Sequence, residues 1–215
     1  SNPDGSMHLG ILESALKEWK GAPVKVEWHP YQLDPNIPES GLDRDTYLTS
    51  KFGDLERMKG MTDHLSNVGK EVGINFDFGP NWLAVNTLHL HQLLHVAGNE
   101  GFRDALKERF LKAYFEETKH LNDTKVLNEI MTEFGWSAEK VANIIADDSI
   151  AYAVKSEIAH YQQLGVSGVP FFIINNKYGI SGAQPSEVLL EALASVSPIE
   201  LIAEGESCDP ATGEC

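Results

Sequence analysis

The segment GVSGVPFFIINNKYGISGAQ, residues 165–184, constrains the fold of this chain more than any other. Pro170 opens an aromatic and β-branched run. A proline cannot donate a backbone hydrogen bond, so it is confined to the start or the edge of a strand. The pair Asn175-Asn176 then favours a tight turn before a second short run. The segment therefore predicts a hairpin of two strands, residues 170–175 and 178–181.

Length, composition and charge narrow the classes of function. The chain has 215 residues, of which 42% are hydrophobic, and this is enough for one large domain or two small ones with a packed core. No apolar run reaches the roughly 18 residues that a transmembrane helix needs. The formal net charge of −15 disfavours nucleic acid and anionic membrane surfaces as partners, because both bind basic patches.

Apolar spacing predicts mostly helices outside the hairpin. Residues 24–28 alternate apolar and polar side chains, so they predict one further strand. Residues 44–147 are predicted to be helical throughout, with Asp123 or Thr124 capping one helix and Ser137 capping the next. Helices are also expected at residues 7–20, 149–164 and 185–195, and a tail is expected after residue 198.

Three motifs carry a resemblance to a known family. They are VEWHPYQLDP at residues 26–35, Asn86-Thr87 followed by His91 and Leu93, and GVPFF at residues 168–172 followed by GISGAQ. In this order they resemble the DsbA family, in particular its FrnE-like branch of the thioredoxin superfamily, which is related to the 2-hydroxychromene-2-carboxylate isomerases. The resemblance implies an α/β thioredoxin-like fold with an inserted all-helical domain. Residues 1–36 and 148–198 would form the thioredoxin-like domain, residues 37–147 the insertion, and residues 199–215 a tail with a cysteine pair.

The N-terminus departs from this family. There, a β-strand runs into a Cys-x-x-Cys motif at the start of the first long helix. Here Met7 lies near the position of the second cysteine, and the first cysteine and the strand are missing. Two interpretations stay open: residues 1–6 are a vector remnant before a native Met7, or the protein is a natural relative without thiols at this site. Residues 198–203, or a second protomer in a homodimer, are expected to cover the sheet edge that the missing strand leaves.

The resemblance also implies a substrate site. The Val169–Pro170 bond would be cis and would face the redox site, where the backbone of Val169 pairs with a substrate peptide or with glutathione. Asn86 and His91 fall on family positions near this cleft, and Trp82 is a candidate for its lining. Packing in the core or at the domain junction is the alternative role for Trp82 and His91.

A metal site is not expected. His89, His91 and His95 are close in sequence, but on a helix His91 and His95 share a face while His89 points nearly opposite. Two ligands without a carboxylate or cysteine at a matching spacing do not make a typical site.

Cys208 and Cys215 are the two cysteines of the chain. A secreted fold stabilised by disulfides would spread cysteines through its core, so their place in the tail favours a reducing, cytoplasmic compartment. The Asp-Pro and Thr-Gly steps between them favour a turn that lets the sulfurs meet. They are interpreted either as an auxiliary dithiol or as two idle thiols, and their acidic neighbours should raise the thiol pKa values.

The resemblance implies a thiol–disulfide oxidoreductase or disulfide isomerase that acts through a mixed disulfide. Its main dithiol is absent from this chain, so the chain as given is expected to be a poor reductase. Its partner would be a protein disulfide or glutathione, the latter as co-substrate, with no organic or metal cofactor. Ser6 supports an alternative, a glutathione-dependent isomerase or transferase. A third alternative is a peptide-binding module without catalysis.

Overall fold

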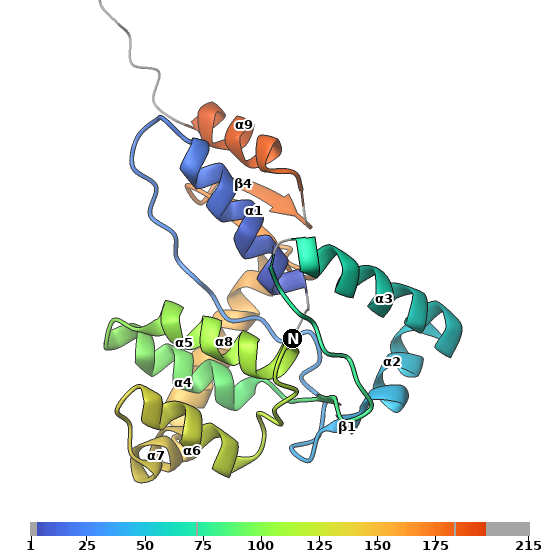
Figure 1. Ribbon diagram of the computed structural model, residues 1–215. Coiled ribbons are helices and arrows are strands. Elements are labelled where there is room, and N and C mark those ends of the chain that lie inside the picture. Colours follow the sequence, from blue (N-terminus) through green and yellow to red (C-terminus); the bar gives the residue numbers. More distant parts are fainter. Residues whose placement is uncertain (1–3, 72, 183, 197–215) are drawn as a thin grey trace, which may run out of the picture.

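The computed structural model describes residues 4–71, 73–182 and 184–196 (Figure 1). The helices are α1 (Asp4–Glu18), α2 (Arg44–Phe52), α3 (Leu55–Glu71), α4 (Leu88–Asn99), α5 (Arg103–Phe115), α6 (Thr124–Glu133), α7 (Ala138–Ala146), α8 (Asp148–Gln163) and α9 (Ser186–Val196). The strands are β1 (Leu42–Asp43), β2 (Leu83–Ala84), β3 (Phe171–Ile174) and β4 (Tyr178–Ser181). Within these described residues, no helix is both long enough and apolar enough to span a bilayer.

The hydrophobic core lies mainly among α4, α5, α6 and α7. On α5, Leu106, Phe110 and Ala113 are spaced at helical intervals and are almost completely buried. The predicted caps are confirmed for the next two helices, because Asp123 accepts a hydrogen bond from the amide of Lys125 and Ser137 from that of Lys140. These local signals fix where α6 and α7 begin.

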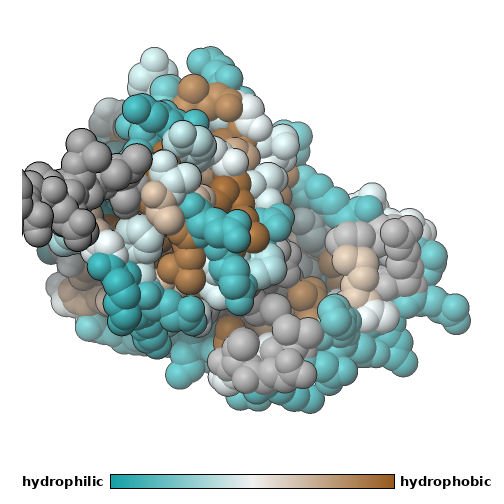
Figure 2. Space-filling model, turned by 90° about the horizontal axis from the view of Figure 1, so that it is seen from above, coloured by the Kyte–Doolittle hydropathy of each residue, from teal (hydrophilic) through white to brown (hydrophobic). Residues whose placement is uncertain are grey.

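The predicted hairpin is confirmed. Strands β3 and β4 pair antiparallel, with Phe172 opposite Ile180. Asn175 and Asn176 both have positive φ, 50° and 55°, which a two-residue turn of this hand requires. At this end of the molecule α1 lies beside α9, and α9 packs against β3 (Figure 1). Figure 2 shows hydrophobic and hydrophilic side chains interspersed on the face that this end presents.

The prediction of a strand at residues 24–28 is wrong. These residues are extended but belong to no strand, and Val24 and Val26 are 38% and 37% exposed. A strand exists only where a neighbour accepts and donates its backbone hydrogen bonds. Among the described residues, β3 pairs with β4 alone, so residues 24–28 have no neighbouring strand. The alternation of apolar and polar side chains is typical of a strand, but a strand also needs a partner for its backbone hydrogen bonds, and the segment alone does not supply one.

The prediction that residues 44–147 are helical throughout is also wrong in one place. Residues 73–87 form an irregular stretch that contains β2, and β2 pairs antiparallel with β1. Aromatic packing holds this stretch, with Phe76 against Phe115 at 5.8 Å between ring centroids. The expected covering of a sheet edge by residues 198–203 lies outside the described residues.

One buried polar side chain joins two helices of the core. Gln92 of α4 is only 1% exposed, and its Nε2 donates to the carbonyl oxygens of Ile144 (3.1 Å) and Ile145 (3.2 Å). These carbonyls belong to the last turn of α7, where most carbonyl oxygens have no backbone donor of the helix, although the amide of Asp147 also donates to Ile144 O at 3.3 Å. Gln92 therefore ends α7 and ties it to α4.

We expect Gln92→Ala to lower the free energy of unfolding by about 2–4 kcal/mol, because it removes a buried donor from the carbonyls of Ile144 and Ile145 and leaves a small cavity. Urea unfolding followed by circular dichroism measures this change. Gln163→Ala, at the exposed end of α8, is the matched control and should change stability by less than about 0.5 kcal/mol. Equal effects of the two substitutions would contradict the role given to Gln92.

Candidate functional site

A cleft of about 210 Å³ lies between the extended segment 29–33, helices α4 and α5, and Val169 ahead of β3. Most of its walls are apolar, and a few polar groups converge on it, which is the usual composition of a ligand site. The side chains that line it are His29, Tyr31, Leu33, Thr87, Leu90, His91, Leu94, Lys107, Phe110, Tyr114, Leu121 and Val169.

The extended segment supplies one wall of the cleft through alternation. In an extended chain, successive side chains point to opposite sides, so His29, Tyr31 and Leu33 share one side. All three line the cleft. Gln32, on the other side, is buried and donates to Asn86 Oδ1 at 3.1 Å. The segment that follows the predicted strand therefore makes a wall of the site.

Asn86 holds the chain that follows this wall. Its Nδ2 donates to the carbonyl oxygens of Pro35 (3.2 Å) and Ile37 (2.8 Å), and its Oδ1 accepts from the amide of Leu88 at 3.0 Å as well as from Gln32. Asn86 was predicted to contact substrate. The structure places it next to the cleft, with its amide engaged in fixing residues 32–37 against the start of α4.

His91 lies in the cleft as the sequence predicted. Its Nε2 is 3.0 Å from the carbonyl oxygen of Tyr31, and a carbonyl only accepts, so Nε2 carries the proton. Burial lowers the pKa of His91 to about 4, partly opposed by this hydrogen bond. The imidazole is therefore neutral near pH 7, and its Nδ1 is an acceptor.

His29 and Glu157 form a hydrogen bond at one end of the cleft. His29 Nδ1 is 2.7 Å from Glu157 Oε1, and the His29 ring lies 4.5 Å from that of Tyr161, also on α8. The sequence analysis missed this pair. The two residues are 128 positions apart, so no local pattern could have joined them.

Lys107 is the cation of the cleft. Its Nζ lies 3.2 Å from the centroid of the Trp28 ring and 3.5 Å from Glu108 Oε1. Only 15% of its side chain is exposed, and burial lowers the pKa of its amine. Nothing in the sequence marked this lysine, because its burial depends on Trp28 of the distant extended segment.

The remaining predicted residues lie at different distances from this site. The Val169–Pro170 bond is cis, and Val169 lines the cleft. Trp82 is 4% exposed and packs 5.3 Å from Tyr114, which does line it, so Trp82 lies one layer behind the wall. The backbone of Ser6 belongs to α1, but its side chain lies outside the described part. Cys208 and Cys215 also lie outside the described residues.

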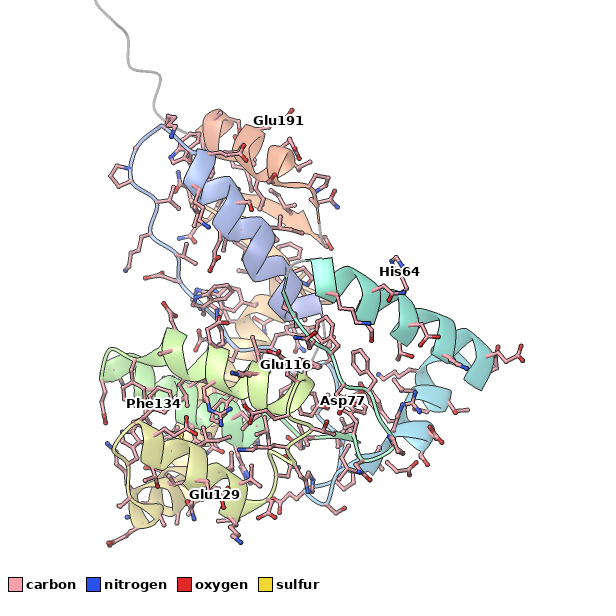
Figure 3. All side chains as sticks on the ribbon, in the orientation of Figure 1. His64, Asp77, Glu116, Glu129, Phe134 and Glu191 are labelled. Atoms are coloured by element: carbon pink, nitrogen blue, oxygen red, sulfur yellow. The ribbon has the colours of Figure 1, made fainter. Side chains whose placement is uncertain are left out.

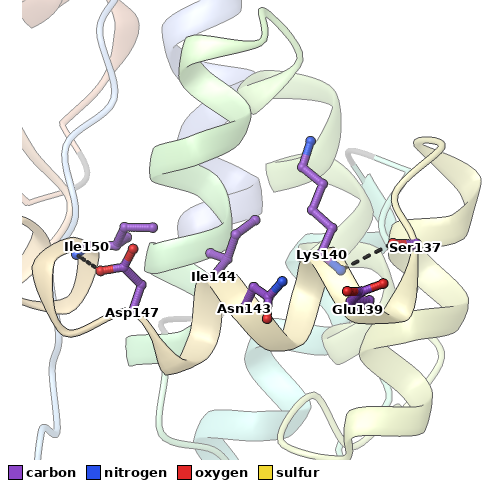
Figure 4. A pocket seen from close by; sticks show the side chains of 7 residues that line it. All are labelled: Ser137, Glu139, Lys140, Asn143, Ile144, Asp147 and Ile150. Atoms are coloured by element: carbon purple, nitrogen blue, oxygen red, sulfur yellow. Dashed lines mark hydrogen bonds between the residues drawn. The ribbon is translucent and has the colours of Figure 1, made fainter.

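Among the residues that the structure describes, no group of three or more His, Cys, Asp or Glu side chains could hold a metal ion. A second hollow, of about 310 Å³, runs along α7 between Ser137 and Ile150 (Figure 4). Ser137 and Asp147 cap helices there, and Lys140 pairs with Glu100. It contains none of the predicted site residues, so the cleft at Val169 is the candidate site.

Three comparisons relate the chain to known proteins. A model of the DSBA-like thioredoxin domain family matches residues 9–194. The crystal structure of a probable DsbA oxidoreductase from Streptomyces coelicolor is 31% identical, with a TM-score of 0.83, and the match covers 97% of this chain and 92% of that one. The uncharacterized protein YwbO of Bacillus subtilis is 23% identical over 177 residues, or 81% of this chain and 84% of YwbO.

We expect His91 to make the free energy of unfolding depend on pH. Its pKa of about 4 lies below the ordinary 6.5, so the unfolded chain binds the proton first as the pH falls. The contribution is therefore complete above pH 6.5 and is lost progressively towards pH 4, by roughly 2–3 kcal/mol.

The measurement is urea unfolding of the wild type and of His91→Gln at several pH values between 4 and 7. The stability difference between them should shrink as the pH falls. His64→Gln is the control, since His64 is exposed on α3 and projects away from the body (Figure 3). A difference independent of pH would show that His91 is not buried in neutral form.

Proposed function

The chain belongs to the family of DSBA-like thioredoxin domains, with the thioredoxin fold and a helical insertion, and on that premise we propose that it is a thiol–disulfide oxidoreductase that acts through a mixed disulfide. The observation that carries the proposal is the cleft beside Val169. It combines apolar walls with a neutral imidazole, His91, and a half-buried amine, Lys107.

The proposed reaction is thiol–disulfide exchange. A thiolate of the protein attacks one sulfur of a guest disulfide, that S–S bond breaks, and the other guest sulfur leaves as a thiolate that takes up a proton. The second protein thiolate then attacks the mixed disulfide and releases the reduced guest. The guest gains two electrons, and the protein pair becomes a disulfide.

Cys208 and Cys215 are the sulfur pair that we propose for this role, because the sequence contains no other cysteine. Six residues lie between them, and the turn-forming steps in this stretch allow ring closure. A protein disulfide or glutathione is the proposed partner, and no organic or metal cofactor is needed. The cytoplasm is the proposed compartment, since a dithiol that cycles needs a reducing pool.

We expect purified protein to exchange with glutathione disulfide, and we expect Cys208→Ser and Cys215→Ser each to stop turnover. One of the two single variants should accumulate a mixed disulfide with glutathione, visible by mass spectrometry, because the resolving thiol is gone. The double variant is the background control. Turnover that persists in the double variant would refute the proposed role of this pair.

We expect Leu33→Trp to weaken exchange by raising the KM for the guest about tenfold, or about 1.4 kcal/mol, because Leu33 lines the cleft and is partly exposed at it. Steady-state kinetics with the same disulfide measures this. The matched control is Leu164→Trp, on a leucine that is 60% exposed and does not line the cleft. An unchanged KM in Leu33→Trp would place the guest elsewhere.

A further inference from the structure

We propose that the cleft generates a thiolate: His29, positioned by Glu157, takes the proton from a small organic thiol, and Lys107 stabilises the anion that forms. This inference rests on the proposed function, in which such a thiol returns the oxidised protein pair to its reduced state. It assigns a role to three residues that the sequence analysis did not single out.

The hydrogen bond to Glu157 decides which nitrogen of His29 can accept a proton. A carboxylate oxygen only accepts, so at 2.7 Å the His29 Nδ1 must be the donor. In the neutral ring Nε2 then carries the lone pair. No described residue makes a hydrogen bond to Nε2, while the His29 side chain lines the cleft and is 40% exposed. Nε2 is therefore the nitrogen available to a guest.

The orientation of this ring is fixed from two sides. Glu157 and Tyr161 lie one turn apart on α8, the first bonding the ring edge and the second contacting the ring at 4.5 Å between centroids. A base held by a carboxylate in this way is a recurrent arrangement for general base catalysis.

Lys107 provides the positive charge that a thiolate needs. Lys107 lines the same cleft, and its Nζ lies 3.2 Å from the centroid of the Trp28 ring and 3.5 Å from Oε1 of the exposed Glu108. Thiolates form readily beside a lysine or a protonated histidine, since either cation lowers the thiol pKa. Once His29 is protonated, its imidazolium and the ammonium of Lys107 would both act on the sulfur of the guest.

The size and walls of the cleft favour a small guest. A volume of about 210 Å³ admits a group the size of one ring, and a folded protein cannot enter it. Leucines and aromatic rings make up most of the lining, so the body of the guest should be apolar. The guest has one proton to donate. Two nitrogens of residues that line the cleft can accept a hydrogen bond, Nε2 of His29 and Nδ1 of His91.

The step transfers one proton and no electrons. The S–H bond of the guest breaks, its electron pair stays on sulfur, and the proton moves to His29 Nε2, giving a thiolate and an imidazolium paired with Glu157. The thiolate can then attack the disulfide of the oxidised protein pair, which forms a mixed disulfide and releases one protein thiolate. A second guest thiolate attacks the mixed disulfide, the guest disulfide leaves, and the other protein thiolate is released. These steps are the reverse of the exchange described above.

The test follows the protonation of His29 by nuclear magnetic resonance in the full chain, with the imidazole nitrogens labelled with ¹⁵N. The probe is 4-methylbenzenethiol, and the control probe is its S-methyl thioether, which has the same body but no proton to give. We expect the thiol, and not the thioether, to convert His29 Nε2 from the unprotonated to the protonated form. Chemical-shift changes at Leu90 and Leu94 should show that both probes enter the cleft.

Variants separate the roles. His29→Gln should still bind the thioether but should leave the bound thiol un-ionised. His160→Gln is the matched control, because His160 contacts the same Tyr161 ring from the exposed side of α8 and does not line the cleft. With thiol bound, Glu157→Gln should reduce the protonated fraction of His29, because the ring is no longer held, Glu157→Asp should restore part of it, and Lys107→Met should reduce it without loss of thioether binding.

An Nε2 that stays unprotonated with thiol bound, or a cleft that binds neither probe, would overturn this inference. The proposed function is judged separately. If the protein exchanges with glutathione disulfide but His29 stays unprotonated, only this inference is wrong. If His29 takes the proton but no exchange occurs, only the proposed function is wrong.

Discussion

The site depends on the hydrogen bonds that side chains at the start of α4 and just before it make to the chain segment of residues 31–37. In the described part of the protein, no strand pairs with this segment. Asn86 bonds the carbonyls of Pro35 and Ile37, and His91 donates to the carbonyl of Tyr31. Backbone groups that a sheet would normally pair are bonded here by side chains from α4 and from the residues just before it. This arrangement keeps residues 29–33 extended, so that alternate side chains form a wall of the cleft.

The electrostatics of the cleft follow from the same packing. His91 is neutral because the wall covers it, and Lys107 has a lowered pKa because Trp28, at the beginning of the wall, lies under its amine. His29 is held by Glu157, which comes from α8 on the other side. Three elements distant in sequence thus supply an acceptor, a cation and a base to one hollow that is otherwise apolar, where charges interact more strongly than in water.

Sequence patterns predicted a helix start or a hairpin correctly where the interaction that forms it joins residues close together in the chain. Pro170 and the Asn175-Asn176 pair predicted the hairpin, and Asp123 and Ser137 predicted the helix starts, because a turn or a cap is formed by residues a few positions apart. Alternation at residues 24–28 predicted a strand wrongly, since a strand needs a partner. Val169 and His91 were predicted in the site, whereas the pairing of His29 with Glu157 was not.

The sequence by itself determined the hairpin, the amphipathic helices, the family and two residues of the cleft, because periodicity, caps and motifs are written in neighbouring positions. Only the tertiary structure decided which side chains share the cleft, which histidine is neutral and which lysine is buried. Burial and charge at a site depend on residues brought together from far apart in the chain, and no short-range pattern encodes those distances.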